Sequence, residues 1–432
     1  MPVQRPPGST RRPMNSGHGL LPASTGHMAR TSQSTAKVPV LVVGAGPVGL
    51  VAAIELREQG VDVRIIDEQS EASKQTYPVV VHSRTLRLLA ALGVTTPLEW
   101  RGHTIRHLAI YSGAIRRAVL ALPSAEPIAS GALTLPQGVL RRALVRRLST
   151  LGVEVEWSTR LVALKQEPGR VRIELIRQEQ VEDESPGHEP EWLDVASQAS
   201  EVDFVIGADG VRSTVRRALG IEMQPHGARQ IYAFFDAPDQ RAGDGAHLVL
   251  SEGKGSSVYP LQSGVSRFSF QVGVGEPHPL GVTQLRQLLT ARMPWYASSG
   301  DDVEWSGSAE FHPALAACFG QGRVWLAGDA AHMTGPLGAQ SVNVGMRESS
   351  DLALRISRCL RDSDLDALGS AYCEQRRVEW ECLLGVAPGE PDTSRAPDWV
   401  RGEIGVLLPS LPAAGEDLDD LLEQLGVSIE RR

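Results

Sequence analysis

The residues best suited to chemistry are those of a glycine-rich turn, Gly44-Ala45-Gly46-Pro47-Val48-Gly49, which Asp67 follows. Gly44 would allow a tight reversal, Gly46 would let a diphosphate approach the backbone, and Gly49 would let a helix pack closely on a strand. The N–H groups at the start of that helix would face the diphosphate. Asp67 is placed to accept hydrogen bonds from ribose hydroxyls, which favours FAD or NAD over NADP.

Two later segments place an aspartate beside glycine after a short apolar run. One extends from Asp203 to Arg216 and contains Ala208-Asp209, and the other extends from Gly322 to His332 and contains Gly328-Asp329. In this order after the glycine turn, they resemble the fingerprints of the single-component FAD-dependent aromatic hydroxylases, class A flavoprotein monooxygenases similar to para-hydroxybenzoate hydroxylase. The resemblance extends over nearly all of residues 38–380.

The resemblance implies a place at the cofactor for each motif. Asp329 would bind the ribityl or diphosphate-linked part of FAD, and Gly328 would leave room for it. Asp209 would lie in a loop that serves both FAD and the nicotinamide cofactor. Gln137 would form a hydrogen bond near the diphosphate and the ribityl chain.

The resemblance also implies that a loop beginning near Pro336 passes the flavin ring. Backbone N–H groups of Val342 and Asn343 would reach the pyrimidine carbonyl at a helix N-terminus, where the dipole favours the charge of reduced flavin. No catalytic residue and no metal site are predicted. The predicted cofactor-binding residues are Gly44, Gly46, Pro47, Val48, Gly49, Asp67, Gln137, Asp209, Gly328, Asp329, Pro336, Val342 and Asn343.

The sequence departs from the family pattern around this loop. Ala339 and Ser341 stand where the family usually has glycine, and Gly335 stands in place of a proline. Tyr77-Pro78 replaces an arginine that commonly precedes the next helix. These departures concern the geometry of the flavin ring and leave the prediction of FAD binding unchanged.

Several other polar residues are interpreted structurally. We expect His332 to be a packing or capping residue rather than a base, because the flavin would supply the reactive group. We expect Arg212 and Arg216 to form a solvated helix face. Three aromatic residues in predicted strands are expected to be core residues rather than substrate contacts: Tyr232, Tyr259 and His247.

The resemblance implies an FAD-dependent monooxygenase driven by NADH or NADPH. It would insert one oxygen atom of O₂, through a flavin C4a-hydroperoxide, into an aromatic or electron-rich secondary metabolite by hydroxylation or epoxidation. One alternative is a reductase or desaturase of the same fold, and another is a non-catalytic flavin-binding protein that recruits a partner through Asp417 to Leu425. A plain NAD dehydrogenase would leave Asp209 and Asp329 unexplained.

The elements that must position these residues follow from hydrophobic patterns and glycine or proline breaks. Strands are expected at 38–43, 61–66, 202–206 and 324–327, and helices at 48–59, 83–92, 137–151 and 342–359. Segments 153–157, 161–165 and 171–176 indicate a β-meander, and 177–201 a loop or long hairpin tip. Antiparallel strands are expected at 231–235, 247–250, 257–261 and 267–274.

We therefore predict an α/β fold with a Rossmann-like FAD-binding domain, an inserted mixed or antiparallel β-sheet substrate domain and C-terminal helices. The FAD-binding domain would comprise residues 38–108, 135–224 and 316–362, and the substrate domain 109–134 and 225–315. Residues 363–432 would be helical with a break at 386–397, and residues 1–37 a disordered tail. Met14 or Met28 is an alternative start.

The amino-acid composition limits the classes of partner and the location that we expect for the protein. A net charge of −8 argues against nucleic acid. The longest apolar run, Val38 to Ile54, is interrupted by glycines and prolines, so we expect no transmembrane segment. Four cysteines without metal-ligand spacing indicate a cytoplasmic protein. The expected partners are a small aromatic substrate, NAD(P)H and O₂, in a monomer or homodimer.

Overall fold

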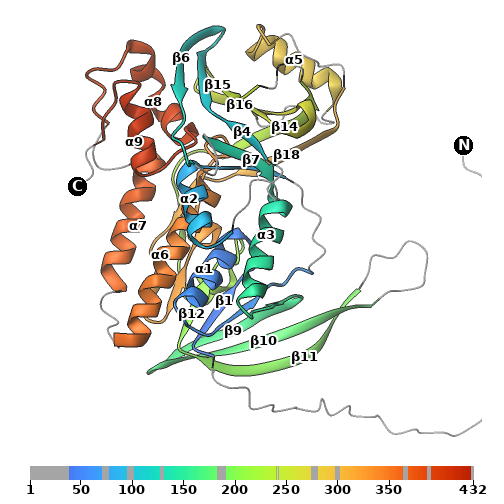
Figure 1. The fold of residues 1–432 in the computed structure, drawn as a ribbon, viewed down its shortest axis with the longest axis vertical. Helices are drawn as coiled ribbons and strands as arrows, with labels where there is room; N and C mark the ends of the chain where they lie inside the picture. Colours follow the sequence, from blue (N-terminus) through green and yellow to red (C-terminus); the bar gives the residue numbers. More distant parts are fainter. Residues whose placement is uncertain are drawn as a thin grey trace, which may run out of the picture. The chain divides into compact units, whose positions relative to one another are not determined.

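The computed structural model describes residues 38–70, 77–94, 102–126, 131–181, 191–239, 241, 243–273, 281–296, 302–362, 368–386 and 391–429. The predicted disordered tail, residues 1–37, lies outside the described residues. The segment from Lys37 to Arg432 forms a compact unit (Figure 1).

A mostly parallel sheet positions the predicted cofactor residues. Its strand order is β20-β21-β12-β1-β2-β8, and only the β20–β21 pair among these is antiparallel. The carboxyl ends of parallel strands meet at the same edge of a sheet. The segments that hold Gly44, Asp67, Asp209 and Asp329 each follow a different strand of this sheet. The strands are β1 (Val40–Val43), β2 (Val63–Ile66), β8 (Val155–Glu156), β12 (Phe204–Gly207), β20 (Gly320–Gln321) and β21 (Val324–Leu326).

Helix α1 (Pro47–Glu58) packs between two other helices beside this sheet, α3 (Gln137–Thr150) and α6 (Gln340–Asp362) (Figure 1). Most of α1 is apolar and buried, as a helix enclosed in this way requires. Gly60, with φ +76°, follows its end, as the sequence predicts. The strand–helix–strand unit of β1, α1 and β2 is therefore confirmed.

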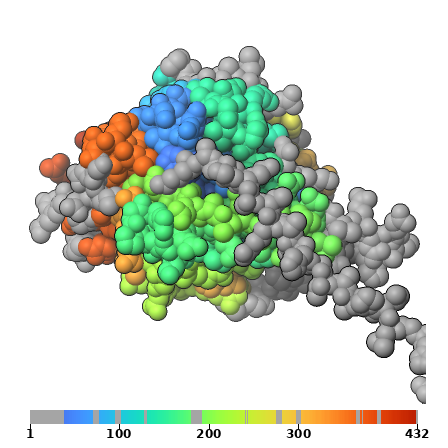
Figure 2. Space-filling model, turned by 90° about the horizontal axis from the view of Figure 1, so that it is seen from below, coloured from blue at the N-terminus to red at the C-terminus, as the bar shows by residue number. Residues whose placement is uncertain are grey.

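An antiparallel meander of β9 (Thr159–Glu167), β10 (Arg170–Val181) and β11 (Glu191–Val202) packs its apolar side chains into the main core. Its green atoms form the middle of the surface seen from below in Figure 2. The predicted meander was wrong in its first strand, because 155–156 pairs with β2 in the parallel sheet instead. Residues 177–201, predicted as a loop or a long hairpin tip, belong to a long hairpin that is paired as far as Val181 and Glu191, and its tip lies outside the described residues.

A second large sheet has the order β18-β14-β17-β16-β15-β5-β6. The four predicted antiparallel strands between 231 and 274 are confirmed as β14 to β17. Helix α5 (Val282–Arg292) shares a core with one face, and the side chains of the other face join the core of the parallel sheet. The strands are β5 (His107–Ser112), β6 (Ile115–Ala121), β14 (Gln230–Pro238), β15 (Gly245–Ser251), β16 (Lys254–Pro260), β17 (Val265–Val272) and β18 (Trp305–Phe311).

Short sheets and further helices join these two layers. One small sheet pairs β7 (Ala132–Pro136) with β3 (Pro78–Val81) and β4 (His103–Ile105), and another pairs β19 (Ala314–Ala316) with β13 (Met223–Pro225) and β22 (His332–Met333). The helices are α2 (Ser83–Ala91), α4 (Thr214–Ala218), α7 (Gly369–Leu383), α8 (Asp398–Ser410) and α9 (Glu416–Glu423). The predicted helical C-terminal region is thus confirmed. Among the described helices, none is both long and apolar enough to cross a membrane.

Candidate cofactor site

The three glycines of the turn have different surroundings. A Cβ on Gly44, whose φ is +102°, would lie 2.3 Å from the carbonyl oxygen of Ala208, and one on Gly49 would lie 1.9 Å from that of Gly44. A Cβ on Gly46 would meet no described atom within 4 Å. Gly44 and Gly49 are therefore required by packing, whereas Gly46 leaves open space above the backbone.

Helix α1 begins at this open space. Gly46 is its N-cap and Pro47 its first residue, so no side chain caps the N–H groups of the first turn. The turn carries no acid that would compete for them. Uncapped N–H groups and the positive end of the helix dipole favour a bound anion such as a diphosphate.

Asp67 holds the glycine turn in place. Its carboxylate accepts hydrogen bonds from the N–H groups of Ala45, at 2.7 Å, and of Gln69, at 2.8 Å. A carboxylate offers about four acceptor positions, so two remain for ribose hydroxyls. The adjacent Glu68 is exposed.

A cavity of about 240 Å³ lies above the turn. Asp67, Gln137 and Asp209 all line it, so three separate predicted segments meet there. Arg141 lines it too, with its guanidinium 4.6 Å from the centre of the Trp157 ring. Its Nη2 is buried and has no hydrogen-bond partner among the described residues.

Asp209 connects this cavity to helix α4. Its Oδ2 accepts hydrogen bonds from the N–H groups of Thr214 and Val215, at 2.6 and 3.1 Å, and so caps the helix. Its Oδ1 is buried without a partner among the described residues. An unpaired buried acceptor and the unpaired donor on Arg141 are what a polar ligand in this cavity would satisfy. The residues present therefore fit an adenine dinucleotide.

Arg216 joins the second motif to the third. Its guanidinium donates to the carbonyls of Ala330, at 2.9 Å, and Val211, at 2.8 Å, and the residue is 9% exposed. The expectation of a solvated helix face is wrong for Arg216, because α4 turns this side chain towards the segment after β21. Burial lowers its pKa, while the nearby Asp209 carboxylate raises it. Arg212 is exposed and lines the cavity.

A buried acid supports the third motif. Glu348, on α6, accepts hydrogen bonds from the N–H of Gly328 and from the indole of Trp380. Its Oε1 also lies 2.6 Å from His332 Nε2, and the His332 ring stacks on Trp380 at 3.6 Å. His332 is fully buried, in agreement with the expected packing role.

Asp329 follows β21 and is exposed to solvent, with His332 and Glu348 near its carboxyl group. These surroundings raise the pKa of the Asp329 carboxyl chiefly by desolvation, with a further increase from Glu348 and a decrease from His332. Gly328, at φ +65°, lies against Val48, and a Cβ there would be 3.0 Å from its Cγ2. The first and third motifs are therefore in contact.

The loop from Pro336 to Asn343 is fixed by elements on both sides. The Tyr259 hydroxyl donates to the carbonyl of Leu337 at 3.0 Å, and His82 Nε2 lies 2.9 Å from that of Gly338. Burial lowers the pKa of His82 to about 3, so its ring is neutral and Nε2 carries the proton that bonds to the carbonyl. Tyr259 thus contacts this loop, which its expected role as a core residue did not include.

The side chain of Asn343 secures the start of α6. It accepts from the N–H of His82, at 2.8 Å, and donates to the carbonyls of Val80 and Ala339, at 2.7 and 2.8 Å. Both bonds donated by the amide go to protein carbonyls, so the side chain has a structural role and the predicted flavin contact concerns the backbone of Asn343. Val342 is half-buried in the same first turn, whose N–H groups lack full helical pairing.

The sheet face opposite this loop carries polar side chains. A Cβ on Gly335 would lie 2.7 Å from Gln230 Oε1, and the Tyr232 hydroxyl is 3.5 Å from both Gln230 and Gln271. His247 belongs to the opposite face, where it packs against Tyr296 beneath α5. Tyr232 is therefore a buried core residue on the face turned towards this loop, in agreement with its expected role, and His247 lies on the other face.

Sequence reasoning missed Arg141 and Glu348 as site residues, and it missed the buried role of Arg216. Arg141 is one of several arginines on α3, and arginines spaced along a helix in this way are typical of a solvated face. Glu348 carries a usable signal, since an acid within the buried face of an amphipathic helix needs partners. The identity of those partners depends on tertiary structure.

Comparisons with known proteins agree with this geometry. The family described as "FAD binding domain" matches residues 37–383. Pentachlorophenol 4-monooxygenase of Sphingobium chlorophenolicum is 28% identical over 371 residues, which cover 81% of this chain and 64% of that protein. For 6-methylpretetramide 4-monooxygenase of Streptomyces rimosus the identity is 28% over 351 residues, covering 78% and 58%. The chain thus spans less than two thirds of the length of these relatives.

Solved structures show the same fold. The p-nitrophenol 4-monooxygenase of Pseudomonas putida superposes with a TM-score of 0.68 at 23% identity, covering 90% of this chain and 96% of that one. A complex of aklavinone-11 hydroxylase with FAD and aklavinone gives a TM-score of 0.63 at 23% identity, covering 81% and 68%. At these identities the comparison concerns the fold.

Proposed function

This chain belongs to the FAD binding domain family of FAD-dependent aromatic hydroxylases, and we propose that it uses FAD as a monooxygenase. Electrons would come from NADH or NADPH, and one oxygen atom of O₂ would enter an aromatic or electron-rich secondary metabolite. Hydroxylation is the favoured outcome, since the similar p-nitrophenol, pentachlorophenol and aklavinone enzymes are 4-monooxygenases or a hydroxylase. Epoxidation is the alternative.

The observation that carries the proposal is the convergence of the three motifs. The backbone of Gly44 lies against Ala208, Arg216 bonds to the carbonyl of Ala330, and Gly328 packs on Val48. Each contact joins two motifs that are far apart in the sequence. A plain NAD-binding unit would need only the first motif, the glycine turn with its acid.

Different residues of the chain would bind different parts of FAD. The uncapped start of α1 would hold the diphosphate, and Asp67, Gln137 and Asp209 would bind the groups on either side of it. Asp329 would bind the ribityl part, and the backbone at Val342 and Asn343 would hold the flavin ring. FAD bound in this way supplies the redox and oxygen-activating chemistry that no side chain here provides.

The protein would contribute orientation, water exclusion and charge stabilisation. The loop from Pro336 is fixed by His82 and Tyr259, so the first turn of α6 presents its N–H groups in a set direction. Such preorganised donors stabilise negative charge on a bound ring. The sheet face with Tyr232 and Gln271 lies across from this loop, and we propose that the substrate binds between them.

A substrate screen tests the proposal. Purified protein loaded with FAD is mixed with NADH or NADPH, and oxygen uptake is recorded with phenols, quinolines and polyketide aromatics. We expect at least one aromatic to increase both NAD(P)H oxidation and oxygen uptake. Protein that takes up no FAD would contradict the proposal, and substrate-dependent NAD(P)H oxidation without oxygen uptake would favour a reductase.

A further inference from the structure

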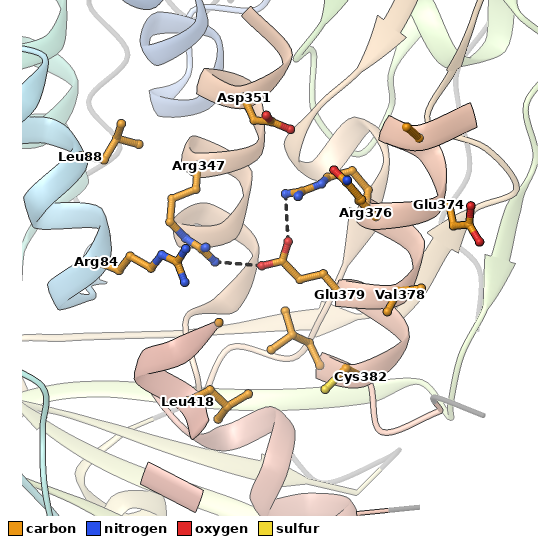
Figure 3. Close-up of a pocket in the computed structure, with 14 residues that line it drawn as sticks. Arg84, Leu88, Arg347, Asp351, Glu374, Arg376, Val378, Glu379, Cys382 and Leu418 are labelled. Atoms are coloured by element: carbon orange, nitrogen blue, oxygen red, sulfur yellow. Dashed lines mark hydrogen bonds and ion pairs between the residues drawn. The ribbon is translucent and has the colours of Figure 1, made fainter. Parts of the chain in front are cut away.

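A second and larger cavity lies apart from the cofactor site. Its volume is about 840 Å³, and it is enclosed by α2, α6, α7 and the start of α9 (Figure 3). It shares no lining residue with the cavity above the glycine turn. On α6, Arg347 and Asp351 line it, whereas Gly345 and Ser349 contact Val48 of α1. The cavity and the flavin-binding motifs therefore lie on different faces of α6.

Three arginines from three helices converge in this cavity: Arg84 of α2, Arg347 of α6 and Arg376 of α7 (Figure 3). One acid, Glu379, accepts ion pairs from Arg347, at 3.1 Å, and from Arg376, at 2.9 Å. Within the described part of the chain, Arg84 has no hydrogen-bond or ion-pair partner for its side chain. One carboxylate thus faces three guanidinium groups.

Two other acids line the cavity. Asp351 is bonded to Arg355 at 3.0 Å, and its charge also raises the pKa of Arg376, so it offsets part of the charge on α7 but forms no ion pair with Arg84 or Arg347 among the described residues. Glu374 is exposed and points away from the arginines in Figure 3. Burial lowers the pKa of Arg347, which the Glu379 charge raises and the adjacent Arg84 charge lowers. Two neighbouring guanidinium groups in a sheltered space are stabilised when an anion is placed between them.

The rest of the cavity lining indicates the chemistry of the part of the ligand beyond its anionic group. Leu88, Val378, Leu383 and Leu418 supply apolar surface to the same cavity. A carboxylate matches the planar guanidinium fork, and an apolar body would cover these side chains. We propose that this cavity binds an amphipathic organic carboxylate, whose head group lies between Arg84 and Arg347. The proposal is independent of the oxygenase chemistry.

Direct binding to the FAD-loaded full chain tests this site, with octanoate as the probe and octanol as its neutral counterpart. Calorimetry should show saturable binding of octanoate and at least tenfold weaker binding of octanol. Because the two cavities share no lining residue, added FAD should not displace octanoate. Equal binding of octanoate and octanol, or no binding of octanoate at millimolar concentration, would overturn the proposal.

Matched variants locate the site. Arg84→Gln should weaken octanoate binding about tenfold or more, the loss expected for a charge-assisted hydrogen bond. It should also raise the melting temperature of the ligand-free protein, because it removes an unpaired like charge beside Arg347. Arg377→Gln removes the same charge from α7 outside the cavity and should leave binding unchanged. Unchanged binding in Arg84→Gln, or equal losses in both variants, would refute the assignment.

Discussion

At the scale of single residues, Gly46 and Gly49 separate cofactor binding from folding. Gly46→Ala adds a methyl group to open space, so we expect the free energy of unfolding to change by no more than about 0.5 kcal/mol while FAD affinity falls sharply. Gly49→Ala drives a Cβ into the carbonyl of Gly44 and should cost about 2–4 kcal/mol. Chemical unfolding of apoprotein and FAD titration measure both. An unstable Gly46→Ala variant, or one with normal FAD affinity, would be inconsistent with this view.

The Asp329 carboxylate should lower the stability of the apoprotein and increase its affinity for FAD. A raised folded-state pKa means that the folded apoprotein holds the proton more tightly than the unfolded chain, so stability is present below the unfolded pKa and is lost as pH rises through the folded one. Asp329→Asn should therefore stabilise the apoprotein at pH 7, with a gain that shrinks towards pH 4. It should weaken FAD binding about tenfold or more. Wild-type FAD affinity in this variant would remove Asp329 from the site.

His82 should make the loop sensitive to acid. Its pKa falls from 6.5 to about 3 on folding, so its contribution to stability is present above the unfolded pKa and is lost as pH falls below 6.5. The maximum slope is about 1.4 kcal/mol per pH unit. Between pH 6.5 and 5 the wild type should lose about 1.6 kcal/mol more than His82→Gln, because the slope at pH 6.5 is half its maximum. Parallel stability curves for the two proteins would show that His82 is not buried as a neutral ring.

At the scale of elements, the loop from Pro336 to Asn343 combines strain with close packing. Ala339 has φ +49°, a region that disfavours a side chain. Ala339→Gly should therefore raise the free energy of unfolding by about 0.5–1 kcal/mol. Gly338→Ala is the matched opposite, because its Cβ would lie 2.5 Å from the carbonyl of Pro409 and should destabilise the protein. Thermal unfolding of both variants checks this, and loss of stability in Ala339→Gly would contradict it.

Local sequence patterns predicted those elements whose ends are marked by neighbouring residues. The first strand, the helix after it and α6 are apolar or amphipathic segments with glycine or polar residues beyond their ends, and the structure confirms all three. The short strand at Val155 was assigned to the wrong sheet, because a brief alternating segment does not specify its partner. Its pairing with Ile65 is decided by tertiary packing.

The residues of the candidate site also fall into those that local motifs predict and those that depend on tertiary contacts. Strand-end residues such as Asp67 and Asp329 follow from motifs, since the spacing of glycine and acid has a local cause. Arg141 and Glu348 act through groups far away in the chain, so no local pattern assigns them. The roles of the predicted binding residues and the domain boundaries stay predictions that the variants above can test.

At the scale of the whole molecule, the fold brings two layers together at one loop. The parallel sheet supplies the motifs of the FAD-binding side, and the second, mixed sheet supplies Tyr232 and Tyr259 on the face turned towards them. The loop from Pro336 is bonded to the second sheet through Tyr259 and to the start of α2 through His82. A flavin ring held at this loop would therefore meet a substrate bound against the second sheet.

The most direct test of the central claim follows oxygen into the product. FAD-loaded protein is reduced anaerobically with NADH or NADPH, ¹⁸O₂ is admitted with an aromatic that increased oxygen uptake, and the product mass is measured. We predict a product that carries one labelled oxygen atom. Reduced protein that is reoxidised while the aromatic is recovered unlabelled, or converted without label, would contradict the account.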